Sequence, residues 1–134
     1  MKISNDLDLW FEYLTLEEQS GSGHGRVREL YERAVALVPI IKEKKAWKRY
    51  IYMWINYAIF EELTTKDHDR ARQVYERVIK LVPHREFSFS KVWILYANFL
   101  VRCADLDKAR KVLGMALGMC PRPKLFKAYA ELEL

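Results

Sequence analysis

Acidic side chains are the first candidates for chemistry in this sequence, because two nearby carboxylates can act as general acid and general base. Glu17 and Glu61 are 44 residues apart, and the same interval separates Trp10 from Trp54. Residues that recur in this way occupy equivalent places in successive copies of a repeated unit, so the width of a whole unit keeps them apart. No serine or cysteine has a recognisable activating partner. The sequence therefore predicts structural acids and no enzyme.

Histidine and cysteine are the residues that would bind a metal such as zinc. His24, His68 and His84 fall in three different connections without a second ligand at helical spacing, and Cys103 and Cys120 are the two cysteines of the chain. This pattern predicts neither a metal nor a cofactor. Because two cysteines are too few for a disulfide framework, we expect free thiols in the core and a reducing compartment.

Glycines form one cluster and one pair. Gly21, Gly23 and Gly25 spell Gly-Ser-Gly-His-Gly, which lacks the Gly-Lys-Ser/Thr ending of a P-loop and predicts a flexible loop. Gly114 and Gly118 are four residues apart, a spacing that lets another helix approach closely. We therefore expect tight helix packing at this pair.

One cluster combines basic and aromatic residues, the combination that meets the phosphates and bases of nucleic acids. Trp47, Tyr50 and Tyr52 are interleaved with it, and Glu43 interrupts it. A solvated lysine face beside core aromatics explains the pattern better, because the net charge is only +5, from 23 Lys and Arg against 18 Asp and Glu. RNA contact is the weaker interpretation. The candidate basic contact patch is Lys42, Lys44, Lys45, Lys48 and Arg49.

The elements that must position these residues are helices. Only five of the 134 residues are Gly and four are Pro, and the stretches between them are rich in Leu, Ala, Glu, Lys and Arg. The longest apolar run, 92–101, is about half of the roughly 20 residues that a membrane span needs. The amino terminus carries acidic residues where an export signal has basic ones. We expect a soluble all-α chain.

Aromatic residues and prolines reveal an internal repeat. The interval from the leading Trp to the closing Pro is 29, 29 and 28 residues in three successive units, and an aromatic residue with a Tyr three positions later opens a fourth. Such spacing predicts Trp packing within each unit rather than stacking on bases. The signature residues are Trp10, Tyr13, Glu17, Arg28, Tyr31 and Pro39; Trp54, Tyr57, Glu61, Arg72, Tyr75 and Pro83; Trp93, Tyr96, Arg110 and Pro121; and Phe126, Tyr129 and Glu133.

Each unit reads as a pair of helices. The second helix carries apolar residues at offsets of 0, 3, 4 and 7, which form one stripe. Asp69 and Asp107 are suitable N-caps for two of these helices, and each should stop at or just before its proline. A single pair cannot bury its stripe alone, so tandem pairs should stack as a solenoid. The stripes are Val27, Leu30, Tyr31 and Ala34; Ala71, Val74, Tyr75 and Val78; and Ala109, Val112, Leu113 and Ala116.

The pattern of the unit resembles the HAT (half-a-TPR) repeat. The first helix has Trp-x-x-Tyr and a Glu seven positions after the Trp, and the second reads Ala-Arg-x-Val-Tyr-Glu-Arg before a closing Pro. A true TPR is less similar, because its ~34-residue period is missing. The resemblance implies a right-handed α-α superhelix of the TPR-like type with about three and a half helix pairs. Its repeats are expected at about 6–39, 44–83 and 88–121, with a half repeat at 124–134.

The stretch Glu43–Leu63 resembles the HAT-repeat proteins of pre-mRNA splicing more specifically. That resemblance implies a nuclear, non-enzymatic scaffold for protein–protein interaction in the NineTeen-type complex of the spliceosome, with other spliceosomal proteins as partners. The alternative is an RNA-contacting helical-repeat subunit of another RNA-processing complex, for mRNA 3′-end or rRNA processing. With fewer than four units, the chain would be a fragment.

The third unit departs from the pattern. Leu100 replaces the Glu, and Leu113-Gly114-Met115 replaces Tyr-Glu-Arg, so both charged positions are lost together. This joint loss predicts an ion pair between the two helices of one repeat. The candidate pairs are Glu17 with Arg33 or Arg28, and Glu61 with Arg77 or Arg72.

The last segment, 124–134, supplies the first helix of a fourth unit. One face should dock on the preceding helix near Val112 and Ala116, while the face around Phe126 and Tyr129 stays uncovered. Because an uncapped solenoid end is adhesive, we expect the fragment to self-associate through this helix.

Overall fold

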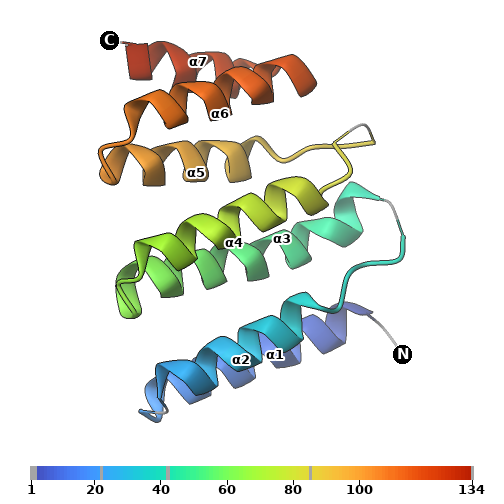
Figure 1. The fold of residues 1–134 in the computed structure, drawn as a ribbon. Helices are drawn as coiled ribbons and strands as arrows, with labels where there is room; N and C mark the ends of the chain where they lie inside the picture. Colours follow the sequence, from blue (N-terminus) through green and yellow to red (C-terminus); the bar gives the residue numbers. More distant parts are fainter. Residues whose placement is uncertain (1–2, 22, 42, 85, 134) are drawn as a thin grey trace. The chain divides into compact units, whose positions relative to one another are not determined.

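The computed structural model describes residues 3–21, 23–41, 43–84 and 86–133, with side chains from Leu7 onward (Figure 1). Within these ranges the chain forms seven α-helices and no β-strand, which confirms the predicted all-α class. A five-residue π-helical turn, η1 (Phe60–Thr64), continues the third helix. The helices are α1 (Ile3–Gln19), α2 (His24–Val35), α3 (Lys44–Ile59), α4 (His68–Leu81), α5 (Ser90–Arg102), α6 (Leu106–Met119) and α7 (Pro123–Glu133).

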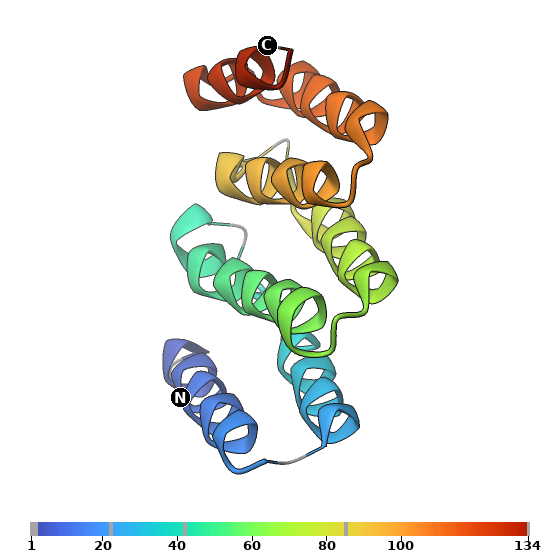
Figure 2. The ribbon, with the colours of Figure 1, turned by 90° about the vertical axis from the view of Figure 1, so that its left-hand side faces the viewer.

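Internal contacts divide the chain into two compact units, Met1–Val74 and Tyr75–Leu134, with the border inside α4. In the first unit, α1 and α3 lie side by side and α2 packs against both (Figure 1, Figure 2). In the second unit, α6 packs against α5 and α7, and α5 also contacts α7. The predicted docking of the last helix on its predecessor is therefore confirmed. Over the described residues, none of the helices combines the length and apolar character needed to cross a membrane.

The apolar stripes of the second helices form the core. All of the predicted stripe residues are buried, with at most 4% of any one exposed. Trp54 and Trp93 are also buried, whereas Trp10 is half-buried with the Arg33 guanidinium 5.6 Å from its ring. The tryptophans therefore pack within the helical layers, as their spacing predicted.

The turns within the helix pairs differ from the prediction. Asp67 and Asp105 cap α4 and α6, in place of the expected Asp69 and Asp107. Each carboxylate accepts the backbone N–H three residues onward, at 3.1 and 3.2 Å respectively. The residue before each cap is left-handed, with φ of 57° and 62°, so the chain reverses earlier and each helix starts earlier.

The glycine predictions were wrong in two respects. Gly25 lies inside α2, so the loop before that helix is shorter than expected, and Gly21 with φ of 79° is the position that needs a glycine. Gly114 and Gly118 are exposed on α6, and a Cβ added at either would meet nothing within 4 Å. Among the described residues, no helix packs tightly against this pair.

Candidate interaction site

Arg28 and Glu61 form an ion pair between successive helix pairs in the first unit. Arg28 lies on α2 and Glu61 in η1, and the guanidinium Nε and Nη2 donate to the two carboxylate oxygens at 2.6 and 2.9 Å. The Glu61 side chain is 1% exposed and that of Arg28 24%. The hydrogen bond to Glu61 raises the pKa of the Arg28 guanidinium, although burial opposes it. This carboxylate is an ion-pair acceptor rather than a free general acid or base.

Tyrosine rings reinforce the same contact. Tyr31 and Tyr57 stack with centroids 4.9 Å apart and planes 3° from parallel, and the Tyr57 hydroxyl donates to Glu32. Phe60 lies 5.4 Å from the Tyr31 ring. Burial, and after it the charge of Glu18, raises the pKa of the Tyr31 hydroxyl. We call these contacts between α2 and the α3–η1 segment the first interface.

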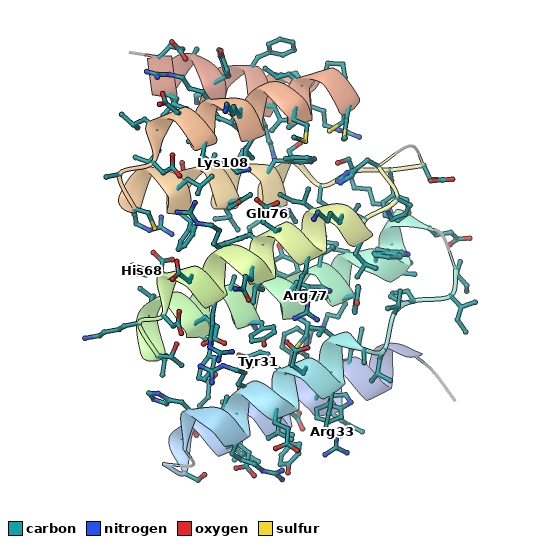
Figure 3. The ribbon with its side chains drawn as sticks, viewed as in Figure 1. Tyr31, Arg33, His68, Glu76, Arg77 and Lys108 are labelled. Carbon is teal, nitrogen blue, oxygen red and sulfur yellow. The ribbon has the colours of Figure 1, made fainter. Side chains whose placement is uncertain are left out.

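The ring contact recurs in the second unit between α4 and α5, which we call the middle interface. Tyr75 and Tyr96 stack at 5.2 Å and 13°, and the Tyr96 hydroxyl donates to Glu76 at 2.5 Å. Lys108 Nζ lies 3.5 Å from the same Glu76 oxygen (Figure 3). Leu100 stands at the sequence place of Glu61 and is fully buried. This interface is apolar where the first is charged.

The last interface, between α6 and α7, keeps an ion pair at the surface. Arg110 Nε lies 2.9 Å from a Glu133 oxygen without hydrogen-bond alignment, and the two side chains are 42% and 44% exposed. On α7, Leu125 is buried, whereas Phe126 is 55% exposed and Tyr129 half-buried. The expected open face is confirmed at Phe126 and only partly at Tyr129.

The basic cluster lies on the first two turns of α3, and two of its aromatic neighbours are not available to bases. Trp47 is buried and its Nε1 donates to the Ile41 carbonyl at 3.1 Å, while the buried Tyr50 hydroxyl donates to the Val35 carbonyl at 2.5 Å. Both rings anchor the backbone that follows α2. Lys42 is outside the described residues; the exposed members are Lys44, Lys45, Lys48 and Arg49.

Arg49 also links α3 to α1, the first helices of two successive repeats. Its Nη2 lies 2.6 Å from an Asp8 oxygen, and its guanidinium carbon lies 4.5 Å from the centroid of the Phe11 ring on α1. The charge of Arg49 is therefore engaged within the fold, whereas Lys45 and Lys48 place positive charge on the exposed surface of the cluster.

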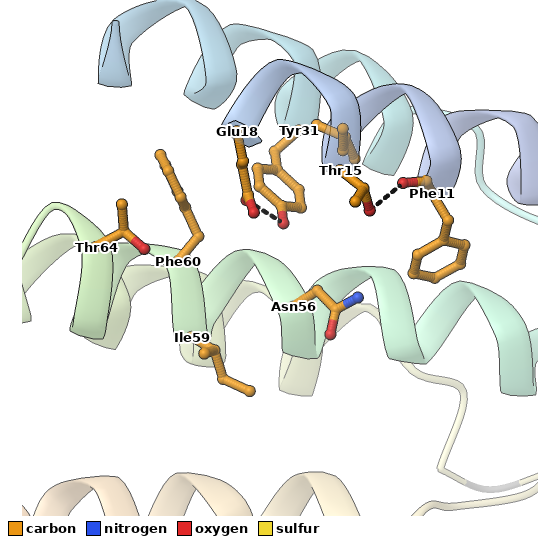
Figure 4. A pocket seen from close by; sticks show the side chains of 9 residues that line it. Phe11, Thr15, Glu18, Tyr31, Asn56, Ile59, Phe60 and Thr64 are labelled. Atoms are coloured by element: carbon orange, nitrogen blue, oxygen red, sulfur yellow. Dashed lines mark hydrogen bonds between the residues drawn. The ribbon is translucent and has the colours of Figure 1, made fainter. Parts of the chain in front are cut away.

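A cleft of about 190 Å³ opens between α1 and the α3–η1 segment (Figure 4). The Tyr31 hydroxyl donates to Glu18 Oε1 at 3.1 Å at this cleft. Its walls are mixed: apolar rings and aliphatic groups lie beside hydroxyl, amide and carboxylate groups, and polar atoms make up more of the exposed lining than apolar ones. A partner side chain that combines an apolar body with a hydrogen-bonding group would suit it. Sequence reasoning missed the cleft, because its α1 residues lie outside the repeat signature. The lining includes Phe11, Thr15, Glu18, Asn56, Ile59 and Phe60.

Metal-binding side chains do not gather in the described part of the chain, where no three His, Cys, Asp or Glu residues are placed to hold an ion. Two of the histidines begin α2 and α4, and His84 follows α4 with its ring nitrogens 2.8 Å from Ser88 Oγ and the Ile79 carbonyl. Cys103 and Cys120 are free thiols, half-buried rather than in the core as expected.

Comparison with known proteins places the repeat in a family. Residues 1–132 match the family described as pre-mRNA-splicing factor Syf1/CNRKL1 N-terminal HAT repeat. The chain belongs to this family. The HAT resemblance inferred from the Trp, Tyr, Glu and Pro spacing is thereby confirmed, and the family implies a helical repeat solenoid.

Curated relatives are similar over almost the whole chain. The chain is 54% identical to protein crooked neck of Drosophila melanogaster over 127 residues, 95% of this chain and 18% of that protein. It is 55% identical to crooked neck-like protein 1 of Homo sapiens over 130 residues, 97% of this chain and 15% of that protein. Pre-mRNA-splicing factor cwf4 of Schizosaccharomyces pombe is 53% identical over 128 residues, 96% of this chain and 19% of that protein. The chain spans less than a fifth of the length of these relatives.

Two pairs of charged HAT positions join successive repeats. Glu61 belongs to the second repeat and its partner Arg28 to the first, and Glu133 with Arg110 repeats this relation. The prediction placed the partner of Glu61 in its own repeat, whereas the structure supplies it from the preceding one. A single sequence does not separate these pairings, because an Arg recurs at this position in all three second helices.

Proposed function

We propose that this chain is part of a non-enzymatic scaffold for protein–protein interactions in pre-mRNA splicing, and that it acts in the nucleus. The observation that carries the proposal is the 53–55% identity, over 95–97% of the chain, to proteins that include a named pre-mRNA-splicing factor. The fold supports it, because the conspicuous charged and aromatic repeat residues hold helix pairs together instead of converging on a reaction site.

The interfaces suit a scaffold. A buried bidentate ion pair and stacked tyrosines fix α2 against α3, so the faces of the first unit are presented in a defined geometry. A surface that is ordered before binding loses less conformational entropy when a partner binds. The α1–α3 cleft and the exposed end of α3 are the surfaces that we assign to partners.

Other spliceosomal proteins, in a NineTeen-type complex, are the partners that we propose. The RNA-contacting alternative has less support, because two of the three aromatic residues of the cluster, Trp47 and Tyr50, are buried, and the third, Tyr52, is half-buried. Exposed lysines alone would give salt-sensitive and sequence-independent contact with phosphates.

Affinity purification of the full-length protein from nuclear extract tests the proposal. We expect splicing proteins to co-purify, to resist nuclease treatment, and to stay bound when the salt concentration is raised. Depleting the protein should reduce splicing of a reporter pre-mRNA, and adding the full-length protein back should restore it. Recovery of 3′-end or rRNA-processing proteins instead, or loss of all partners on nuclease treatment, would favour the RNA-contacting alternative.

A further inference from the structure

The connection after α2 exposes four large aliphatic side chains within five residues. Leu37 is 45% exposed, Val38 43%, Ile40 88% and Ile41 52%. Clusters of exposed apolar side chains commonly mark interaction sites, whereas single exposed side chains need no explanation. We call these four residues the aliphatic stretch.

Hydrogen bonds hold the aliphatic stretch in place at both ends. Tyr50 donates to the carbonyl of Val35 where α2 ends, and Trp47 donates to the carbonyl of Ile41 where the stretch ends. Pro39, in the middle, is buried and anchors the backbone between the exposed residues. The four side chains are thus displayed by a fixed backbone, so binding requires little further ordering.

The equivalent connection in the next repeat buries two of its large apolar side chains. Val82 stands 44 residues after Val38 and is 4% exposed, against 43% for Val38. Phe87, later in the same connection, is 8% exposed. The repeat fold therefore does not require exposed aliphatic residues after its second helix, and their exposure in the first repeat needs a separate cause.

Positive charge adjoins the aliphatic stretch. Lys44, Lys45 and Lys48 are exposed on the first two turns of α3. Two acidic residues lie near them: Glu43, which precedes the helix, and Asp8, whose carboxylate is held by Arg49. The amino-terminal end of α3 adds the positive end of a helix dipole. A partner that covers this surface must combine apolar side chains with negative charge.

We propose that the aliphatic stretch, together with Lys44, Lys45 and Lys48, is a docking site for an acidic protein segment whose large apolar side chains cover Ile40 and Ile41. The proposal rests on the proposed scaffold function and deepens it by naming the chemistry of one partner. Aliphatic side chains give bases nothing to stack on, which disfavours RNA. Membrane anchoring by a surface segment needs a larger apolar face or a second anchor, which disfavours a lipid surface.

Fluorescence anisotropy with the full-length protein tests the chemistry. The probes are a Leu/Glu amphipathic peptide and a matched peptide with Lys in place of Glu; we expect only the acidic peptide to bind. Ile40→Ser with Ile41→Ser, and separately Lys45→Glu with Lys48→Glu, should each weaken binding about tenfold or more. The matched controls are Leu63→Ser, at a side chain 64% exposed elsewhere in the first unit, and Lys111→Glu on α6. Both should change binding by less than about twofold.

A photo-crosslinking amino acid at position 40 tests the occupant directly in nuclear extract. Crosslinks to a protein segment rich in Asp or Glu beside Leu, Ile, Phe or Met are the expected result. Crosslinks to RNA or to basic segments would overturn the proposal. So would tight binding to phosphatidylserine–phosphatidylcholine vesicles that Ile40→Ser with Ile41→Ser abolishes, or failure of the acidic peptide to bind.

The two proposals can fail separately. If the Ile40→Ser, Ile41→Ser protein still captures every splicing protein that the unaltered protein captures, the docking site is wrong and the scaffold function stands. If the unaltered protein captures no splicing protein, the scaffold function is wrong whatever the peptides show. The substituted side chains are exposed, so unchanged circular dichroism should accompany both variants.

Discussion

The first and last interfaces use the same HAT positions under different degrees of burial. In the first, Glu61 is 1% exposed and accepts two hydrogen bonds from Arg28. In the last, Glu133 is 44% exposed and meets Arg110 through one contact that lacks hydrogen-bond alignment. An ion pair at the surface contributes about 0–1 kcal/mol, whereas breaking a buried one costs several. The same pair of residue types therefore contributes very different amounts to the stability of the two interfaces.

The aromatic positions of the signature are likewise more buried at the first interface than at the last. Trp54 is 3% exposed, and Phe126, which opens the last unit at the equivalent place, is 55% exposed. Tyr57 donates to Glu32 across the first interface, while Gly114 stands at the place of Glu32 in the third repeat. The repeat signature identifies which residues are in contact, and burial determines how much each contact stabilises the fold.

Removing the leading aromatic side chain should show the largest contrast. Trp54→Ala should lower the free energy of unfolding by about 3–5 kcal/mol, because it leaves a cavity in the core. Phe126→Ala should cost less than about 1 kcal/mol, since over half of that side chain already faces solvent. Urea denaturation measures both. Similar decreases in the free energy of unfolding for the two variants would contradict the claim that burial determines the contribution of each aromatic position.

Removing the arginine should give the next contrast. Arg28→Ala leaves the buried Glu61 carboxylate without its counter-charge, with a hydrogen bond from the Thr65 hydroxyl remaining, and should cost about 3 kcal/mol or more. Arg110→Ala should cost no more than about 1 kcal/mol. Arg28→Lys is a useful control, because it keeps the charge and loses the bidentate geometry. Its loss of stability should lie between those of Arg28→Ala and Arg110→Ala. Thermal or urea unfolding of the three variants provides the test.

Loss of one tyrosine hydroxyl should have a smaller effect. Tyr57→Phe removes the donor to the Glu32 carboxylate and should cost about 1.5–3 kcal/mol, as should Tyr96→Phe with Glu76. Tyr129→Phe should change stability by less than about 0.5 kcal/mol. A large effect at Tyr129 would show that the last interface is stronger than its burial indicates.

The smallest expected effect is a gain in stability when a helical glycine is replaced by alanine. Gly114→Ala should stabilise the protein by roughly 0.5–1 kcal/mol, because the position is helical and a new Cβ meets nothing within 4 Å. Gly21→Ala is the matched control and should destabilise, because its φ of 79° is left-handed. A loss of stability in Gly114→Ala would mean that another helix does pack there.

Periodicity predicted the core well. The stripe residues of all three second helices are buried as their offsets of 0, 3, 4 and 7 required, since a helical face follows directly from 3.6 residues per turn. Helix starts were less predictable, because the turns before α4 and α6 each offer two acidic residues as caps, and a left-handed residue places the earlier one at the cap. The π turn that carries Glu61 has no sequence signal that we recognise.

The candidate site was predicted only in part. The lysines at the start of α3 were identified, but the aliphatic stretch beside them was not, because Val38 and Val82 occupy equivalent places in sequence and differ only in what packs over them. The partner of Glu61 was misassigned for a similar reason: neighbouring repeats carry the same Arg, and spatial order alone decides between them. Tertiary contacts, not local pattern, determine these features.

Two double-mutant cycles test most directly whether burial determines how much an ion pair between repeats stabilises the fold. One cycle combines Arg28→Ala with Glu61→Ala, and the other Arg110→Ala with Glu133→Ala, each scored by the free energy of unfolding. We predict a coupling energy of about 2–3 kcal/mol for the buried pair and less than about 0.5 kcal/mol for the surface pair. Equal coupling energies in the two cycles would contradict the account.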